Sequence, residues 1–182
     1  MSRNRFDIFA GFERMMTMDD AAWARHANPL SIYTRIPILP LLSLAIFSRV
    51  WLGWLTLLAV ALVLLWTWLN PRAFAPPAHT ESWAARGTFG ERVFLNRARI
   101  PIPPHHARWG IALAGASALG FPPWLYGLWA LDAGWLLFGL TLLVGAKLWF
   151  VDRMGWLYQD MHSADPAYTA WHRPRPGSAS PL

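Results

Sequence analysis

Four apolar runs separated by polar segments set the pattern of this sequence. The clearest is Val50–Leu69, which holds no charged residue and ends at Asn70-Pro71. A helix rises about 1.5 Å per residue, so this run would extend roughly 30 Å, the thickness of the hydrocarbon core of a bilayer. Tryptophans lie near both of its ends, where amphipathic rings favour the headgroup zone. The run therefore predicts a membrane-spanning helix.

The preceding span is predicted over Ser31–Ser48, and its pattern is less regular. Pro37 and Pro40 each remove a backbone donor, which predicts a kink or a late helix start near one membrane surface. Arg35 lies early enough in the run for its guanidinium to reach the headgroups. A tight turn at Gly53 then joins this span to the next as a helical hairpin.

The third and fourth spans form a second predicted hairpin. The third begins near residues 107–109 and meets Pro122-Pro123, which break or kink it, so 124–131 is either its end or an interfacial turn. Asp132 is a suitable N-cap for the fourth span, Ala133–Val151, whose helix continues into the headgroup region. The predicted fold class is all-α: an integral membrane protein with four transmembrane helices as two helical hairpins, with short interfacial amphipathic helices.

Polar segments flank and connect the hairpins. Asn4–Met16 places apolar residues three and four apart, which predicts an amphipathic helix. Thr80–Arg86 and Thr88–Ala98 predict two short helices lying on an anionic membrane surface. The expected divisions are an N-terminal cytoplasmic or interfacial segment (1–30), a first transmembrane hairpin (31–70), a basic cytoplasmic loop (71–108), a second hairpin with a juxtamembrane extension (109–161) and a Pro-, Ser- and Ala-rich disordered tail (162–182).

Composition and charge support a membrane protein and orient it. Hydrophobic residues make up 55% of the chain and charged residues 14%, which disfavours a soluble protein with one buried helix. The formal charge is +6, and Arg49 is the only basic residue in the turns opposite the termini. The positive-inside rule therefore predicts a multi-pass protein of the bacterial inner membrane with both termini and the central loop in the cytoplasm.

The basic residues also suggest partners. Because they lie beside apolar spans, anionic lipid headgroups explain them more simply than nucleic acid does. The expected headgroup contacts are Arg86, Arg92, Arg97, Arg99, Lys147 and Arg153. Small residues at Gly110, Ala114 and Ala118 line one face of the third span, and such faces let helices approach closely in lipid. This face predicts packing against other membrane proteins or a second copy.

Candidate chemistry is sparse. The chain has no cysteine, which excludes thiolate sites and disulfides. The predicted cytoplasmic side carries a set of histidines and carboxylates from which an interfacial enzyme site could be built: His26, Glu91, His105, His106, Asp152 and Asp160. No zinc-binding spacing occurs, and adjacent histidines on a helix do not face one another, so neither a metal nor a cofactor is expected. Structural ion pairs are the favoured interpretation.

Several segments resemble a family of small prokaryotic membrane proteins known only as a domain of unknown function. The resemblance covers about Met16–Met161 and rests on Trp23–Arg35, Arg49–Trp54, Trp66–Phe74, Gly90–Arg92 and Lys147–Met161. It implies a polytopic membrane protein and assigns no activity. The sequence therefore favours a component that packs against lipid or other membrane proteins. A small membrane enzyme is the first alternative. A transporter subunit is the second, although the interiors of the spans at 53–66, 110–121 and 135–146 carry no charge.

Overall fold

The computed structural model describes residues 20–177, and this part of the chain is helical without strands. The predicted amphipathic helix at Asn4–Met16 lies outside the described residues. The helices are α2 (Asp20–His26), α3 (Pro29–Tyr33), α4 (Ile38–Phe47), α5 (Arg49–Leu52), α6 (Leu55–Ala73), α7 (Trp83–Leu95), α8 (Pro104–Leu119), α9 (Phe121–Ala130), α10 (Ala133–Met161) and α11 (Pro166–Ala170), with a 3-10 turn at Asn96–Ala98.

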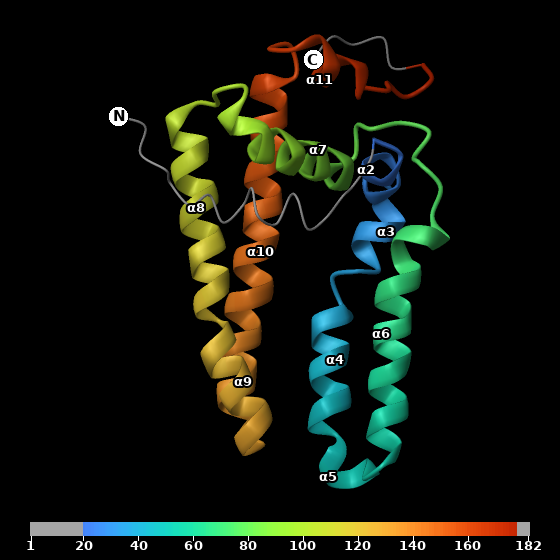
Figure 1. The fold of residues 1–182 in the computed structure, drawn as a ribbon, viewed down its shortest axis with the longest axis vertical. Coiled ribbons are helices and arrows are strands. Elements are labelled where there is room, and N and C mark those ends of the chain that lie inside the picture. The colour runs from blue at the N-terminus through green and yellow to red at the C-terminus, as the bar shows by residue number, and fades with distance from the viewer. Residues whose placement is uncertain (1–19, 178–182) are drawn as a thin grey trace.

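Two helical hairpins stand side by side (Figure 1). One consists of α4 and α6, joined through α5, and the other of α8–α9 and α10. Four segments are long and apolar enough to cross a membrane: Pro29–Phe47, Leu55–Ala73, Pro104–Ala130 and Ala133–Met161. The predicted all-α class with four candidate spans in two hairpins is confirmed.

Turn residues lie where the sequence predicts them. Gly53 has a φ of 51°, a left-handed conformation that suits glycine, and it ends α5 before α6 begins. Asp132 caps α10, because its side chain accepts a hydrogen bond from the Trp135 amide at 3.0 Å. The first span is interrupted between α3 and α4, ahead of Pro40, in agreement with the predicted late start. Residues 121–130 prove to be helix.

Two helix ends differ from the prediction. The second span does not stop at Asn70, since α6 continues through Pro71 to Ala73. The third span begins at Pro104, which is the first helical residue of α8 and needs no amide donor there. This earlier start places the two residues that follow Pro104 inside the first turn of α8.

Small residues bring α8–α9 and α10 together. A Cβ added at Gly120 would lie 2.8 Å from the Gly139 carbonyl oxygen, so these two backbones are nearly in contact. At Gly127 an added Cβ would overlap the α10 backbone near Leu136. The Ser117 hydroxyl donates to the Leu143 carbonyl at 3.0 Å. Close approach of this kind is how helices associate in lipid, where van der Waals contact takes the place of hydrophobic burial.

Helix α7 corrects the prediction for the central loop. We predicted two short helices separated at Gly87, but Trp83–Leu95 is one continuous helix, and Ser82 caps it by accepting from the Ala85 amide at 3.1 Å. Gly87 and Gly90 lie inside the helix and are buried, because α7 crosses α10 there with almost no space between the backbones. Most of its turns are buried in the fold, where it bridges the tops of the two hairpins (Figure 1).

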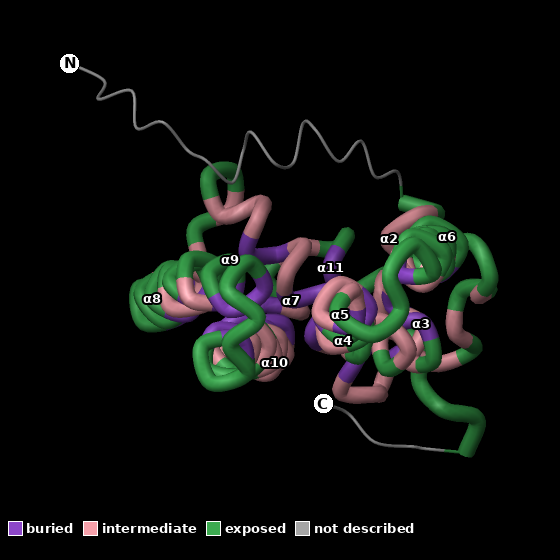
Figure 2. The backbone as a smooth tube through the Cα atoms, turned by 90° about the horizontal axis from the view of Figure 1, so that it is seen from below, coloured by how far each residue is buried: buried purple, intermediate pink, exposed green. Residues whose placement is uncertain are grey.

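The hairpins touch each other near their lower ends as drawn. The Trp124 indole N–H donates to the Ser43 hydroxyl at 2.8 Å in a buried contact. Arg49 donates to the carbonyls of Leu128 and Trp129 at 2.6 and 3.0 Å. These carbonyls lie in the last turn of α9, where they have no hydrogen-bond donor within the helix. Figure 2 shows the buried backbone gathered between the hairpins, whereas α6 is mostly exposed.

The C-terminal part differs from the expected disordered tail. Within it, residues 166–170 form α11, and the Tyr168 side chain is buried against the cluster that joins α7 and α10. Trp171 stacks on Phe89 of α7 with ring centroids 5.6 Å apart. The Thr80 amide donates to the Arg173 carbonyl at 2.9 Å. Aromatic packing and hydrogen bonds thus hold this Pro- and Ser-rich stretch against the fold.

Candidate functional site

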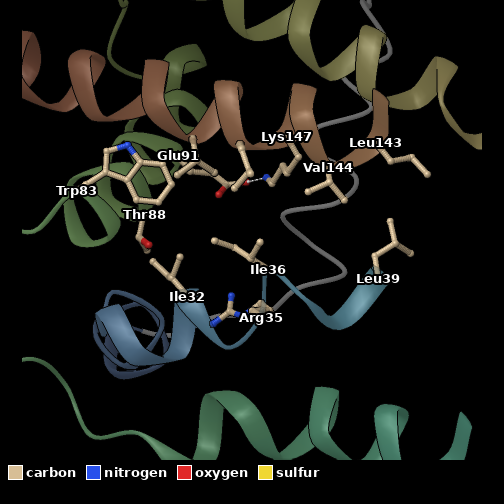
Figure 3. A pocket seen from close by; sticks show the side chains of 12 residues that line it. Ile32, Arg35, Ile36, Leu39, Trp83, Thr88, Glu91, Leu143, Val144 and Lys147 are labelled. Carbon is tan, nitrogen blue, oxygen red and sulfur yellow. Dashed lines mark hydrogen bonds and ion pairs between the residues drawn. The ribbon is translucent and has the colours of Figure 1, made fainter. Parts of the chain in front are cut away.

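A cavity of about 240 Å³ lies between the two hairpins, below α7 (Figure 3). Its walls are mainly aliphatic side chains from α3, α4 and the middle of α10, and Trp83 and Thr88 of α7 close one end. The lining residues are Ile32, Arg35, Ile36, Leu39, Trp83, Thr88, Glu91, Leu143, Val144, Lys147, Leu148 and Val151. Three of these are charged, although the cavity is otherwise apolar.

Two of the charged residues neutralise each other. Lys147 of α10 donates to a Glu91 carboxylate oxygen of α7 at 2.8 Å, and Figure 3 shows this pair across the cavity from Arg35. The Lys147 ammonium also lies 4.7 Å from the centre of the Phe150 ring. This ion pair joins α7 to α10 beside the cavity.

Arg35, the third charged residue, has only neutral hydrogen-bond partners among the described residues, and the Glu91 carboxylate acts on it electrostatically without an ion pair. Its Nη2 donates to the Ser31 hydroxyl at 2.7 Å, and its Nε lies 3.4 Å from the Asn70 side-chain oxygen. It forms no ion pair with any residue of the described part. Among the described residues, these two contacts leave some of the five guanidinium donors without a partner, so the cavity carries a net positive charge that a bound anion would balance.

Asn70 is the centre of the network that holds Arg35. Its side chain is fully buried at the end of α6. The carboxamide oxygen accepts from the Ser31 hydroxyl at 2.8 Å, and the carboxamide nitrogen donates to the Thr34 hydroxyl at 2.7 Å. Since a buried amide is costly without partners, these bonds fix the side chains of α3 against α6 and hold Arg35 beside the cavity.

The charged end of the cavity lies at the level of an aromatic belt. Trp66 donates from its indole N–H to the Thr34 carbonyl at 3.3 Å, one residue from Arg35. On α10, Trp149 follows Lys147 by two residues and contacts Trp109 of α8, with ring centroids 5.6 Å apart. Tryptophan gathers where a membrane changes from hydrocarbon to headgroups, and here tryptophans lie beside the charged residues of an otherwise apolar cavity.

The six sequence candidates do not form one site. Glu91 lies at the cavity, while Asp152 accepts from the Trp83 indole at 2.9 Å just beyond it. His26 is half-buried in α2, where its Nδ1 donates to the Ala22 carbonyl at 2.9 Å, and burial lowers the pKa of its imidazole. The remaining three come together where α8 begins and α10 ends: His105, His106 and Asp160.

The basic residues expected to contact headgroups are largely engaged with the protein. Arg92 pairs with Asp20 and stacks on Trp171, with 4.2 Å between the guanidinium carbon and the ring centre. Arg97 donates to the Phe94 carbonyl at 2.9 Å. Arg153 lies over the ring of Trp109 at 5.5 Å. Headgroup contacts by these and by Arg86, Arg99 and Lys147 remain predictions.

Sequence reasoning missed the network at the cavity. The sequence predicts that the Arg35 guanidinium reaches the headgroups. It predicts no role for Ser31, Thr34 or Asn70. One signal is present in the sequence: an arginine and an asparagine lie near the ends of two adjacent apolar runs, and polar side chains within such runs tend to bond to one another. The sequence does not say which face of either helix carries them.

Four candidate spans in two hairpins, with charge at one end and an apolar cavity between them, define a helical membrane protein with several spans. The chain belongs to a family of unknown function, DUF6653, whose model matches residues 10–176. No curated protein and no solved structure matches it.

Proposed function

We propose that this protein binds an anionic phospholipid of the surrounding membrane, with one acyl chain in the cavity between the hairpins and the phosphate on Arg35. The observation that carries this proposal is an aliphatic cavity with an arginine that forms no ion pair in the described chain and whose hydrogen-bond partners there are neutral. An aliphatic wall favours hydrocarbon, and a planar guanidinium offers paired donors to phosphate.

The size of the cavity fits part of a lipid. Its volume of about 240 Å³ is just below the range of about 300–1,000 Å³ typical of small-molecule sites. A whole phospholipid would not fit, but one chain can occupy the space while the second remains in the bilayer. The Glu91–Lys147 pair beside Arg35 leaves one net positive charge at the cavity, which favours an anionic over a zwitterionic headgroup.

The distribution of basic residues supports a membrane and an orientation for the protein. We propose the bacterial inner membrane, with both termini and α7 in the cytoplasm, because cytoplasmic loops are enriched in arginine and lysine. Arg49 then lies on the opposite side, where the carbonyls at the end of α9 occupy its guanidinium. The cavity opens at the level of the cytoplasmic leaflet in this orientation, and that leaflet is the one with the more negative surface.

A lipid titration tests the headgroup. Delipidated protein in neutral detergent is mixed with phosphatidylglycerol or with phosphatidylcholine of the same chains, and bound lipid is counted by native mass spectrometry. We expect the wild type to favour phosphatidylglycerol by about tenfold. Arg35→Gln should lose this preference and Arg35→Lys should keep most of it. Arg72→Gln, a control at an exposed arginine of α6, should behave as the wild type.

A second pair of variants tests whether an acyl chain occupies the cavity. Val144→Trp places a large side chain inside the cavity, whereas Leu137→Trp adds the same group at a position of α10 that is 61% exposed. We expect the first to reduce lipid binding for both headgroups and the second to leave it unchanged. Equal binding of the two headgroups by the wild type, or full binding by Val144→Trp, would contradict the proposal.

A further inference from the structure

Three side chains meet where the second hairpin ends on the α7 side of the molecule. His105 and His106 lie in the first turn of α8, and Asp160 lies in the last turn of α10. The His106 Nε2 donates to an Asp160 carboxylate oxygen at 2.8 Å. One potential ligand atom from each of the three residues lies within 4.8 Å of the others.

We propose that these three residues bind one divalent transition-metal ion such as Zn²⁺ or Co²⁺. Two imidazoles and one carboxylate are the ligands that such ions prefer, and three protein ligands leave coordination positions for water. Ligand atoms bound at about 2.1 Å to one tetrahedral ion stand about 3.4 Å apart, a value between the 2.8 Å that joins the His106 and Asp160 atoms and the 4.8 Å within which all three lie.

The fold brings the ligands together although 54 residues separate the two that are bonded. Pro103 and Pro104 start α8 early, which puts both histidines in its first turn instead of in an extended segment. The imidazoles then lie against each other, with ring centroids 4.1 Å apart and planes tilted by 39°. Adjacent helical residues do not normally share a face, so this contact near the helix start is unusual.

One of the three proposed ligands is buried and two are exposed, as expected for a metal site that is open to solvent. The His106 side chain is 5% exposed and is held in place by its surroundings, while the Asp160 side chain is 53% exposed. His105 is exposed as well. The buried imidazole fixes one coordinating atom, and the exposed pair leaves a side open to solvent for entry of the ion and for bound water.

A structural role for the His106–Asp160 hydrogen bond is the alternative, and His105 distinguishes the two. That side chain takes no part in the hydrogen bond and is exposed, so His105→Ala leaves the bond and the fold in place. If the cluster binds a metal, the same change removes one ligand of three. Coordination through His106 Nε2 requires the proton on that atom to move to Nδ1, so uptake of the ion replaces the His106–Asp160 hydrogen bond.

The experiment uses full-length protein in detergent, treated with chelator and then titrated with Co²⁺, whose visible absorption reports on its ligands. We expect one equivalent to bind, with Zn²⁺ as a competitor. His105→Ala and Asp160→Asn should each weaken binding by at least about tenfold. His172→Ala, a control outside the cluster, should bind as the wild type.

Two results would overturn the proposal. One is the absence of a saturable equivalent of Co²⁺ in the wild type. The other is wild-type binding by His105→Ala, because the cluster would then be only a hydrogen-bonded pair with a neighbouring ring. Circular dichroism of each variant establishes that it is folded, so that loss of binding is assigned to loss of a ligand.

Discussion

Gly90 of α7 lies directly against the backbone of Met154 in α10. A Cβ built on Gly90 would overlap the Met154 carbonyl group, and one built on the nearby Gly87 would lie 2.5 Å from the Val151 side chain and 3.0 Å from its carbonyl oxygen. These two glycines therefore let a helix from the central loop cross the longest helix of the molecule at backbone contact. The crossing fixes the upper end of the cavity, because Trp83 and Thr88 are carried by the same helix.

Gly90→Ala should destabilise the protein strongly. The overlapping atoms are backbone and cannot rotate away, so α7 must shift from α10, at a cost of about 1–3 kcal/mol or more. The measurement is thermal unfolding in detergent followed by circular dichroism. Gly115→Ala is the matched control, since Gly115 lies in α8 with nothing within 4 Å of the added carbon. Equal stability of the two variants would contradict the role given to the crossing.

Asn70→Ala should uncouple the first span from the second. Loss of the carboxamide leaves the Ser31 and Thr34 hydroxyls and the Arg35 guanidinium short of partners in a buried place, which costs about 1–3 kcal/mol. Thr67→Ala, a control in the same helix, removes a hydroxyl that bonds only to the Val63 carbonyl. Because Asn70 positions Arg35, the variant should also lose the preference for anionic lipid in the titration described above.

Local signals account for what the sequence predicts correctly. These signals depend only on residues close in sequence: the continuous apolar runs, the turn glycine at Gly53 and the cap at Asp132. The elements that were missed depend on contacts distant in sequence. Gly87 looks like a helix stop, and only the approach of α10, some sixty residues later, explains a glycine inside α7.

The same limit applies to the two sites. The Arg35–Asn70 contact spans 35 residues and the His106–Asp160 contact spans 54, and no spacing rule reaches across such distances. The residue types were visible, but the helix faces that bring them together are set by packing. The tail shows the opposite error, since its composition suggests disorder while Tyr168 is buried.

His26 makes stability depend on pH. Burial lowers the pKa of this imidazole below its ordinary value of 6.5, with Arg35 and Arg25 acting in the same direction and with the Ala22 carbonyl and Glu91 opposing it. The unfolded chain then binds a proton more readily than the folded one, so stability is full above pH 6.5 and falls as the pH is lowered through the folded pKa.

Replacement of His26 by Gln should remove this contribution. Chemical denaturation in detergent at pH values from above 6.5 downward measures the effect, and the difference between wild type and His26→Gln should shrink as the pH falls. A difference that stays constant over the same range would show that His26 does not supply the pH dependence.

The orientation of the spans can be tested on a background without native cysteine. Single cysteines at Pro76 and Ala164, both exposed on the α7 side, should be protected from a membrane-impermeant thiol reagent in intact cells and should react after lysis. Trp54→Cys, at a position 87% exposed in the opposite turn, should react in intact cells. Arginines resist transfer across the membrane, and among the arginines of residues 20–177 Arg49 alone lies on the Trp54 side, so the expected pattern follows from the charge distribution. Labelling of Pro76→Cys in intact cells together with protection of Trp54→Cys would reverse the orientation. It would also place the charged end of the cavity in the opposite leaflet.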